Sequence, residues 1–330
     1  MPQNTLIVAI DLGTSATTAS HARVRDSFDN QGKMLREKLG SVFDVKDWPG
    51  CIEGATGNVC VPTDLVFNRN TRQLLFWGYE AQQYLDDPYH DIPTSDVFVV
   101  ETIKLLLPDP DEAKVPSAAS ARYRGMREVM TATLAKRPEE VFDDFLGPVL
   151  EHILHNAKRK YSTTLHDHHI ELVLAFPSGW PDRIHTTVAG IGARALQKAI
   201  AKHELKNMTF GIENVYTVSE TLCGVKEWLR ETVAESSSST DFDPQTVNLD
   251  ELNVSTPRFH GSKDTKPGCT NEYALQIGDC FLPVDIGGGT GCLTPLKLVS
   301  KNPLGVEQLD KTQCMKHHII WVCDYSMLIW

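Results

Sequence analysis

Two short segments of the chain combine residue types that could bind a phosphate and a metal ion. Residues 11–15 read Asp-Leu-Gly-Thr-Ser, and residues 285–290 read Asp-Ile-Gly-Gly-Gly-Thr. Backbone N–H groups can approach a phosphate closely only where no Cβ intervenes, so a glycine turn can act as an anion-binding nest. A phosphate-bound Mg²⁺ keeps much of its water shell and needs a carboxylate nearby. We therefore predict that the two segments close on one nucleotide.

Each segment stands where a tight turn would join two strands. Apolar runs precede the turns, at residues 6–10 and 281–284, and β-forming residues follow them. These followers are Thr17 and Thr18 in the first segment and Leu293 and Thr294 in the second. Short apolar runs bounded by glycine are typical of buried strands. The pattern predicts two β-hairpins, each with an aspartate at the end of its first strand, next to the turn.

The remaining elements alternate between strands and helices, which favours an α/β sheet. Apolar periodicity predicts helices at residues 138–161 and 181–200, and a nearly continuous apolar run predicts a buried strand at 170–176. The other expected elements are strands at 61–67 and 73–78 around a tight turn, a helix at 80–85, an apolar segment at 98–107, a strand at 215–218 and a helix at 222–229. Residues 24–60 show no sustained periodicity and are expected to form a loop or an insert.

Composition and charge argue against several classes of partner. The chain has 330 residues, is 41% hydrophobic and carries a net charge of −11, so we expect a globular fold without a nucleic-acid partner. The N-terminus shows no secretory signal, and no stretch reaches the roughly 20 apolar residues of a membrane-spanning helix. We expect a cytoplasmic protein with no membrane partner, whose eight cysteines are reduced thiols.

Five stretches, taken in order, resemble the motifs of one superfamily. They are VAIDLGTSATT, VPTDLVFNRNTRQLLFWGYEA, VLAFPSGWPDRIHTTVAGIGARAL, VYTVSETLCGV and VDIGGGT. The superfamily that they resemble contains actin, hexokinase and the seventy-kilodalton heat-shock ATPases. Within it the chain is most similar to the heat-shock chaperones, and closest in character to the divergent heat-shock-like ATPases common in fungi. One short motif is a weak signal, whereas five in the right order are a specific one.

The resemblance implies an α/β fold of the actin-like (ribonuclease H-like) ATPase type, with an essentially complete first lobe and a partial second lobe. It implies ATP or ADP and Mg²⁺ as cofactors, with water as the nucleophile. Asp11 and Asp285 would orient the water shell of Mg²⁺. Lys104 stands where the family has a catalytic lysine, and Glu220 matches its connecting-motif glutamate. The phosphates would be held by Gly13, Thr14, Ser15, Gly287, Gly288, Gly289 and Thr290. Besides nucleotide, the implied partners are co-chaperones or client proteins.

The resemblance also implies a domain organisation. Residues 1–234 would form the first lobe, with the inserted subdomain within residues 24–140. Residues 235–275 are polar, begin with a serine-rich run, and are expected to be a flexible insertion. Residues 276–310 would begin the second lobe, and residues 311–330 would be an atypical tail. The family's adenosine-binding segment and peptide-binding domain have no counterpart, so we expect a truncated or misread gene product.

Each assigned residue also has a purely structural interpretation. Lys104 could snorkel from an apolar segment, Glu220 could be a carboxylate favoured at a helix start, and the aspartates could serve the turns themselves. The family has an acidic residue two positions after the threonine of the second turn, where this chain has Cys292. The resemblance therefore favours nucleotide binding over nucleotide hydrolysis. The alternative functions are a non-catalytic fragment or scaffold, and a small-molecule kinase of the same superfamily.

Two histidine-containing segments could suggest a metal site. Residues 166–169 lie between a predicted helix and a predicted strand with no second pair of ligands nearby, so a solvated loop is expected. A looser zinc-like spacing joins Cys314, His317, His318 and Cys323. Zinc sites normally draw spaced ligands from two places, so metal binding is the less favoured interpretation of both segments.

Overall fold

The structure is a computed structural model that divides into two compact units, Met1–Val218 and Ser219–Trp330, described separately below. It describes residues 3–29, 31, 34–51, 59–87, 92–108, 117–161, 168–177, 180–205, 208–220, 223, 277–278, 280–286, 291–293, 296–301, 304–309 and 319–323. The predicted domain boundaries near residues 234 and 275 lie outside these ranges. Among the described residues, no helix combines the length and apolar character needed to cross a bilayer.

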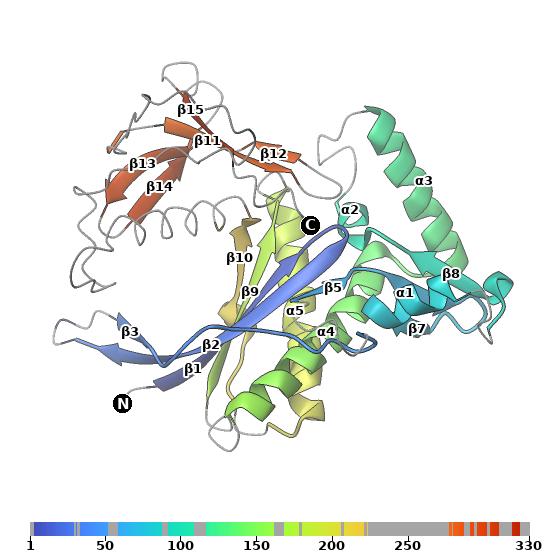
Figure 1. The fold of residues 1–330 in the computed structure, drawn as a ribbon, viewed down its shortest axis with the longest axis horizontal. Coiled ribbons are helices and arrows are strands. Elements are labelled where there is room, and N and C mark those ends of the chain that lie inside the picture. Colours follow the sequence, from blue (N-terminus) through green and yellow to red (C-terminus); the bar gives the residue numbers. More distant parts are fainter. Residues whose placement is uncertain are drawn as a thin grey trace, which may run out of the picture. The chain divides into compact units, whose positions relative to one another are not determined.

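The first unit is built on a sheet whose central strand is β1 (Gln3–Leu12). The main order of strands is β10-β9-β1-β2-β3, and β4 and β5 also pair with β2. β2 (Ala16–Phe28) is antiparallel to β1, whereas β9 (His169–Phe176) is parallel to it (Figure 1). The first predicted hairpin and the buried strand at 170–176 are therefore confirmed.

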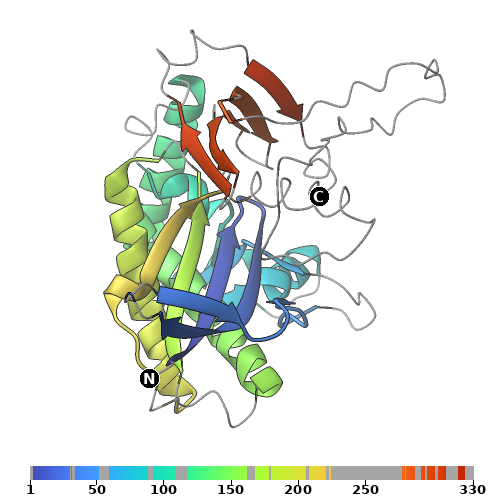
Figure 2. The same ribbon diagram turned by 90° about the vertical axis from the view of Figure 1, so that its left-hand side faces the viewer.

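Two long helices complete the core of this unit. α4 (Pro138–Tyr161) has the predicted bounds, and its predicted apolar face is fully buried at Val141, Phe145 and Val149. α5 (Asp182–Lys202) follows Pro181, as the sequence predicts, and packs against α4. Figure 2 shows α5 in yellow-green beside β9 and β10 (Val215–Ser219). Alternating strands and helices confirm the α/β class.

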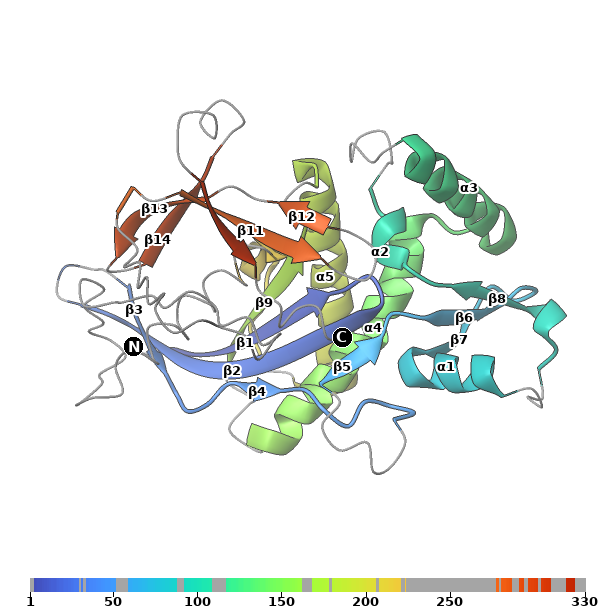
Figure 3. The same cartoon turned by 45° about the horizontal axis from the view of Figure 1, so that its top comes forward.

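A three-stranded antiparallel sheet of order β7-β6-β8 forms a smaller part of the same unit (Figure 3). Its strands are β6 (Leu65–Asn68), β7 (Leu74–Trp77) and β8 (Val97–Val100), and the helices near it are α1 (Gly78–Asp86), α2 (Ile103–Leu106) and α3 (Ser117–Leu134). The predicted short helix and the pairing of two strands around the turn are confirmed, but the predicted strand at 61–67 is divided: residues 60–62 form β5 (Cys60–Pro62) of the main sheet, and β6 alone pairs with β7. At the turn of the pair, Asn68 Oδ1 accepts hydrogen bonds from the N–H groups of Asn70 and Thr71. α3 was not predicted, because its apolar residues form no regular stripe in the sequence.

The expectation that residues 24–60 form a loop is wrong for most of the described part. β2 continues to Phe28, and it is followed by β3 (Met34–Lys38), β4 (Phe43–Asp44) and the start of β5 (Cys60–Pro62). Val45 and Trp48 are buried in the main core. β3 lies at the edge of the sheet with exposed side chains at residues 35–38, so its sequence lacks the apolar periodicity that marks a buried strand.

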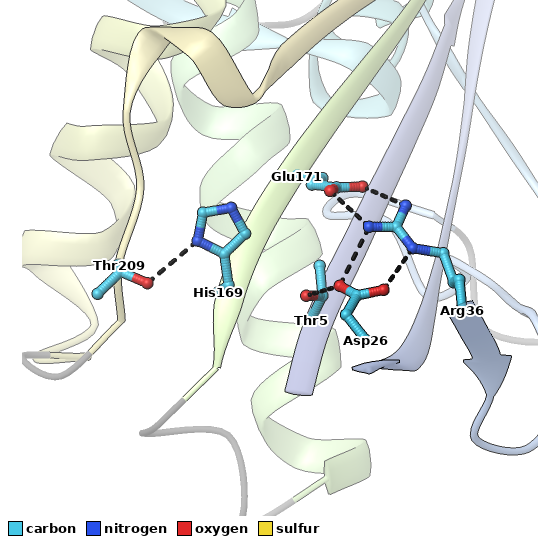
Figure 4. A network of polar contacts seen from close by, with 6 residues as sticks. All are labelled: Thr5, Asp26, Arg36, His169, Glu171 and Thr209. Atoms are coloured by element: carbon cyan, nitrogen blue, oxygen red, sulfur yellow. Dashed lines mark hydrogen bonds and ion pairs between the residues drawn. The ribbon is translucent and has the colours of Figure 1, made fainter. Parts of the chain in front are cut away.

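An ion-pair network, rather than apolar burial, reinforces the backbone ladder that joins β3 to β2. The Arg36 guanidinium donates to both carboxylate oxygens of Asp26 at 2.7 and 3.1 Å, and to both of Glu171 at 2.8 and 2.7 Å (Figure 4). Thr5 Oγ1 adds a hydrogen bond of 2.8 Å to Asp26. One side chain thereby joins β3 to β2 and, across the sheet, to β9.

A buried histidine links β2 to α4. His21 is 1% exposed, with Nδ1 3.0 Å from the Tyr161 hydroxyl and Nε2 3.0 Å from Asn156 Oδ1. An amide oxygen only accepts, so Nε2 carries the proton and Nδ1 accepts from Tyr161. Burial lowers the pKa of His21 from its ordinary value; the hydrogen bond to Asn156 opposes this shift, and the charge of Lys160 adds to it.

The first prediction concerns the pH dependence of stability. Because the folded-state pKa of His21 is lowered, its stabilising effect is complete above the unfolded pKa of about 6.5 and is lost as pH falls toward the folded pKa. The free energy of unfolding in urea should therefore fall between about pH 7 and 5. His21→Gln should flatten this slope, whereas an unchanged slope in that variant would contradict the assignment.

The second unit contains a five-stranded sheet. Its strands are β11 (Cys280–Ile286), β12 (Gly291–Leu293), β13 (Leu296–Lys301), β14 (Leu304–Gln308) and β15 (Ile319–Cys323). β11 pairs antiparallel with β12 and β13 and parallel with β15. The second predicted hairpin is therefore confirmed, and the segment predicted to be an atypical tail contributes β15.

Candidate functional site

The candidate site is the turn between β1 and β2. The ladder pairs Asp11 with Thr18 and Leu12 with Thr17, which leaves residues 13–16 to form the turn. Asp11 also pairs with Ala175 of the parallel strand β9, so the turn lies at the carboxyl ends of two parallel strands. Ligands of α/β sheets commonly bind beyond these ends. Asp11, the predicted metal-orienting residue, is exposed there.

Gly13 occupies a position in which a side chain has no room. A Cβ built on Gly13 would stand 1.9 Å from the carbonyl oxygen of Ala16, well inside van der Waals contact. The turn's own backbone therefore requires glycine at this position. The next two predicted phosphate-binding residues differ in exposure: Thr14 is buried, at 7% exposure, whereas Ser15 is exposed to solvent.

Thr63 is a residue of this site that sequence reasoning missed. Its Oγ1 donates to the carbonyl oxygen of Gly13 at 3.2 Å, and its N–H donates to the carbonyl of Ser15 at 2.9 Å. The side chain is 1% exposed. The available signal was a hydroxyl residue at the end of an apolar run, in Val61-Pro62-Thr63, but no local pattern shows that this run pairs beside the first turn.

Asp64, the next residue, has a perturbed carboxyl group. Burial raises its pKa, the nearby charge of Glu101 raises it further, and a hydrogen bond of 3.1 Å from Gln82 Nε2 opposes both effects. Titratable groups with raised pKa values often lie at functional sites, although structural networks produce them too. The sequence singled out neither Asp64 nor Glu101.

Lys104 lies in α2 and is 3% exposed. Its neighbours Ile103 and Leu106 belong to the same core cluster as Leu12, at the end of β1. Figures 1 and 3 draw α2 next to the turn that joins β1 to β2. With the side chain this deeply buried, the alternative in which Lys104 snorkels to solvent is not supported. Thr102, which precedes α2, adopts a left-handed conformation (φ 57°) that costs a non-glycine residue about 1–2 kcal/mol.

The second hairpin has the same register as the first. Asp285 pairs with Cys292 and Ile286 with Gly291, as Asp11 pairs with Thr18 and Leu12 with Thr17. Each aspartate is thus the penultimate residue of its first strand. Each of these strands also has a parallel neighbour, β9 for β1 and β15 for β11. The two motifs therefore match in the pairing of their strands as well as in their sequence.

Several predicted site residues lie outside what the structure describes. Gly287, Gly288, Gly289 and Thr290 are outside the described residues, and Asp285 is described at the backbone level alone. That Asp11 and Asp285 face one nucleotide stays a prediction. Glu220 directly follows β10 as a partly buried helical residue, a position that suits both of its interpretations.

Within the described part of the chain, no three His, Cys, Asp or Glu side chains lie together so that they could ligate a metal directly. The solvated-loop interpretation of residues 166–169 is wrong for His168 and His169. His168 is 2% exposed, and His169 begins β9, with Nδ1 3.1 Å from Thr209 Oγ1 (Figure 4). Cys314, His317 and His318 are outside the described residues.

Three cysteines of the described part of the chain take part in no disulfide bond. Cys51 and Cys60 are partly buried, and Cys223 is exposed. The reduced state of the eight cysteines stays a prediction.

Comparison with known proteins gives distant matches among solved structures. No family model and no curated protein matches the chain. MreB5 of Spiroplasma citri bound to AMPPNP matches 92% of this chain and 52% of its own chain, at 15% sequence identity and a TM-score of 0.36. Its ADP-bound form matches the same shares of both chains, at 14% sequence identity and a TM-score of 0.35. A non-polymerising mutant of MamK bound to AMPPNP matches 93% of this chain and 55% of its own, at 12% and 0.29.

None of the three is named as a heat-shock chaperone. The chain spans about half the length of these structures. At these identities and TM-scores, the matches assign no family, ligand or activity to this chain.

Proposed function

We propose that the chain binds ATP or ADP with Mg²⁺ through the β1–β2 turn, as part of an actin-like ATPase. The observation that carries this proposal is the turn itself, a glycine loop that tolerates no Cβ at the carboxyl edge of a sheet, with an exposed aspartate at its mouth. The β11–β12 hairpin repeats the register of this turn, so Asp285 occupies the equivalent position in its own hairpin.

The roles follow from exposure and chemistry. The backbone N–H groups of the turn and the exposed Ser15 hydroxyl would hold phosphate oxygens, and the mostly buried Thr14 would contribute its backbone N–H. Asp11 would accept hydrogen bonds from the waters of Mg²⁺, an ion that neutralises phosphate charge when bound. The donor set fits both groups, since the turn offers amides to an anion and a carboxylate to a hydrated cation.

The proposal also includes hydrolysis of the bound ATP by water. Phosphoryl transfer depends mainly on positioning and on neutralising charge, and Lys104 is a buried cation whose helix packs on the same core as β1. Glu220 would help to orient the attacking water. A role as a heat-shock-like chaperone in the cytoplasm, with client proteins or co-chaperones, rests on the sequence resemblance alone.

Nucleotide binding without hydrolysis is the second candidate function. In β12, Cys292 stands opposite Asp285, at the position where the resembled family has an acidic residue. A thiol is a poor substitute for a carboxylate in a hydrogen-bond network around a metal-bound water. Steady nucleotide binding with no release of phosphate would support this candidate over the ATPase.

Calorimetric titration of ADP and ATP, with and without Mg²⁺, tests the proposal. We expect Mg²⁺-dependent binding that Asp11→Asn and Asp285→Asn weaken by roughly tenfold or more, which corresponds to about 1.4 kcal/mol. Asp44→Asn, at an exposed aspartate of β4, is the matched control and should bind normally. Lys104→Ala should mainly slow turnover. Absence of heat at millimolar nucleotide would remove the proposed function.

A further inference from the structure

β5 brings Thr63 beside the candidate phosphate turn. In the ladder between β5 and β2, Ala16 pairs with Pro62 and Thr17 with Val61. Continuing this register by one position places Thr63 opposite Ser15, and the Thr63 N–H donates to the Ser15 carbonyl at 2.9 Å. The sheet therefore extends one residue into the turn, on the side of β5.

The side chain of Thr63 makes a second connection. Its Oγ1 donates to the Gly13 carbonyl at 3.2 Å and lies 3.3 Å from Thr17 Oγ1. A hydroxyl has one proton, so Thr17 must donate to Thr63, which in turn donates to Gly13. Thr17 is fully buried and Thr63 is 1% exposed, so bulk water competes little for this chain of hydrogen bonds.

We propose that Thr63 is a positioning residue that orients the backbone of the β1–β2 turn for phosphate binding. The carbonyl of Gly13 and the N–H of Thr14 belong to one planar trans peptide and point in opposite directions. By holding that carbonyl toward its own side chain, Thr63 directs the Thr14 N–H to the opposite side, where we place the phosphate. The bond to Ser15 fixes the exit of the turn in the same way. The donors are thus oriented before a ligand arrives, which reduces the ordering cost of binding.

The inference rests on the proposed nucleotide function, and three variants test it through ADP titration in Mg²⁺. Thr63→Val keeps the shape and removes the hydroxyl, and it should weaken ADP binding about tenfold or more. Thr63→Ser keeps the hydroxyl and should bind within about twofold of the wild type. Thr17→Val is the matched control, because it removes a buried hydroxyl from the same chain but leaves the bond from Thr63 to Gly13 in place.

The melting temperatures of all variants distinguish a loss of folding stability from a loss of turn orientation. We expect Thr17→Val and Thr63→Val to lower the melting temperature similarly, while Thr17→Val keeps near wild-type ADP affinity. The inference is overturned if Thr63→Val binds ADP as tightly as the wild type, or if Thr17→Val weakens binding equally. A wild-type chain that binds no ADP would instead remove the proposed function, and this inference with it.

Discussion

Gly13→Ala is expected to reduce ADP and ATP affinity by roughly a hundredfold or more. The added Cβ would stand 1.9 Å from the Ala16 carbonyl oxygen, so the backbone of the turn must move. A moved turn no longer directs its N–H groups at the phosphates, and hydrogen bonds to a charged group contribute about 1.5–3 kcal/mol each. Losing two such bonds accounts for the expected factor.

Gly125→Ala is the matched control for this substitution. Gly125 lies within α3, where a Cβ would meet nothing within 4 Å. Alanine is favoured over glycine in a helix by about 1 kcal/mol, so this variant should bind nucleotide normally and melt at the same or a higher temperature. Both variants would be measured by ADP calorimetry and thermal melting. Wild-type affinity in Gly13→Ala would exclude the turn as the phosphate site.

Arg36→Met should lower the free energy of unfolding by about 2–3 kcal/mol. The substitution keeps a long apolar stem but removes the cation shared by Asp26 and Glu171, whose side chains are 13% and 10% exposed. Removing one partner of a buried ion pair is strongly destabilising because the remaining charge is uncompensated. The Arg36 side chain is itself one-third exposed, which places the effect below that of a fully buried pair.

The loss should depend on pH with a defined sign. The hydrogen bond from Arg36 is the largest cause of the lowered pKa of Asp26, which burial opposes. This stabilisation is present above the unfolded pKa of about 3.9 and is lost as pH falls through the folded value. The difference between wild type and Arg36→Met, measured by urea unfolding, should therefore shrink below about pH 4.

Arg25→Met is the control for the Arg36 prediction. Arg25 lies 3.8 Å from Glu37, and the two side chains are 48% and 65% exposed. An exposed pair of this kind contributes little, so this variant should change the free energy of unfolding by less than about 0.5 kcal/mol. An equal effect of the two substitutions would show that the network in Figure 4 does not hold β3.

Elements with a strong local pattern were predictable. α4 has the predicted bounds because its apolar residues recur with the period of a helix and meet one core. The two aspartate hairpins were predictable because each joins an apolar run to β-forming residues through glycine. β3 was missed because an exposed edge strand held by Arg36 needs no apolar alternation.

For the candidate site, the sequence by itself determined the chemistry, namely two aspartates, glycines and hydroxyl residues at the mouths of two hairpins. Their types and spacing are local, and local spacing sets which strand and turn can form. Tertiary structure alone decided that Thr63 ties the carbonyls of Gly13 and Ser15, and that Lys104 is buried in α2. Thr63 and Gly13 are 50 residues apart in the chain, and their contact depends on how β5 pairs with β2. No periodicity within either segment encodes that pairing.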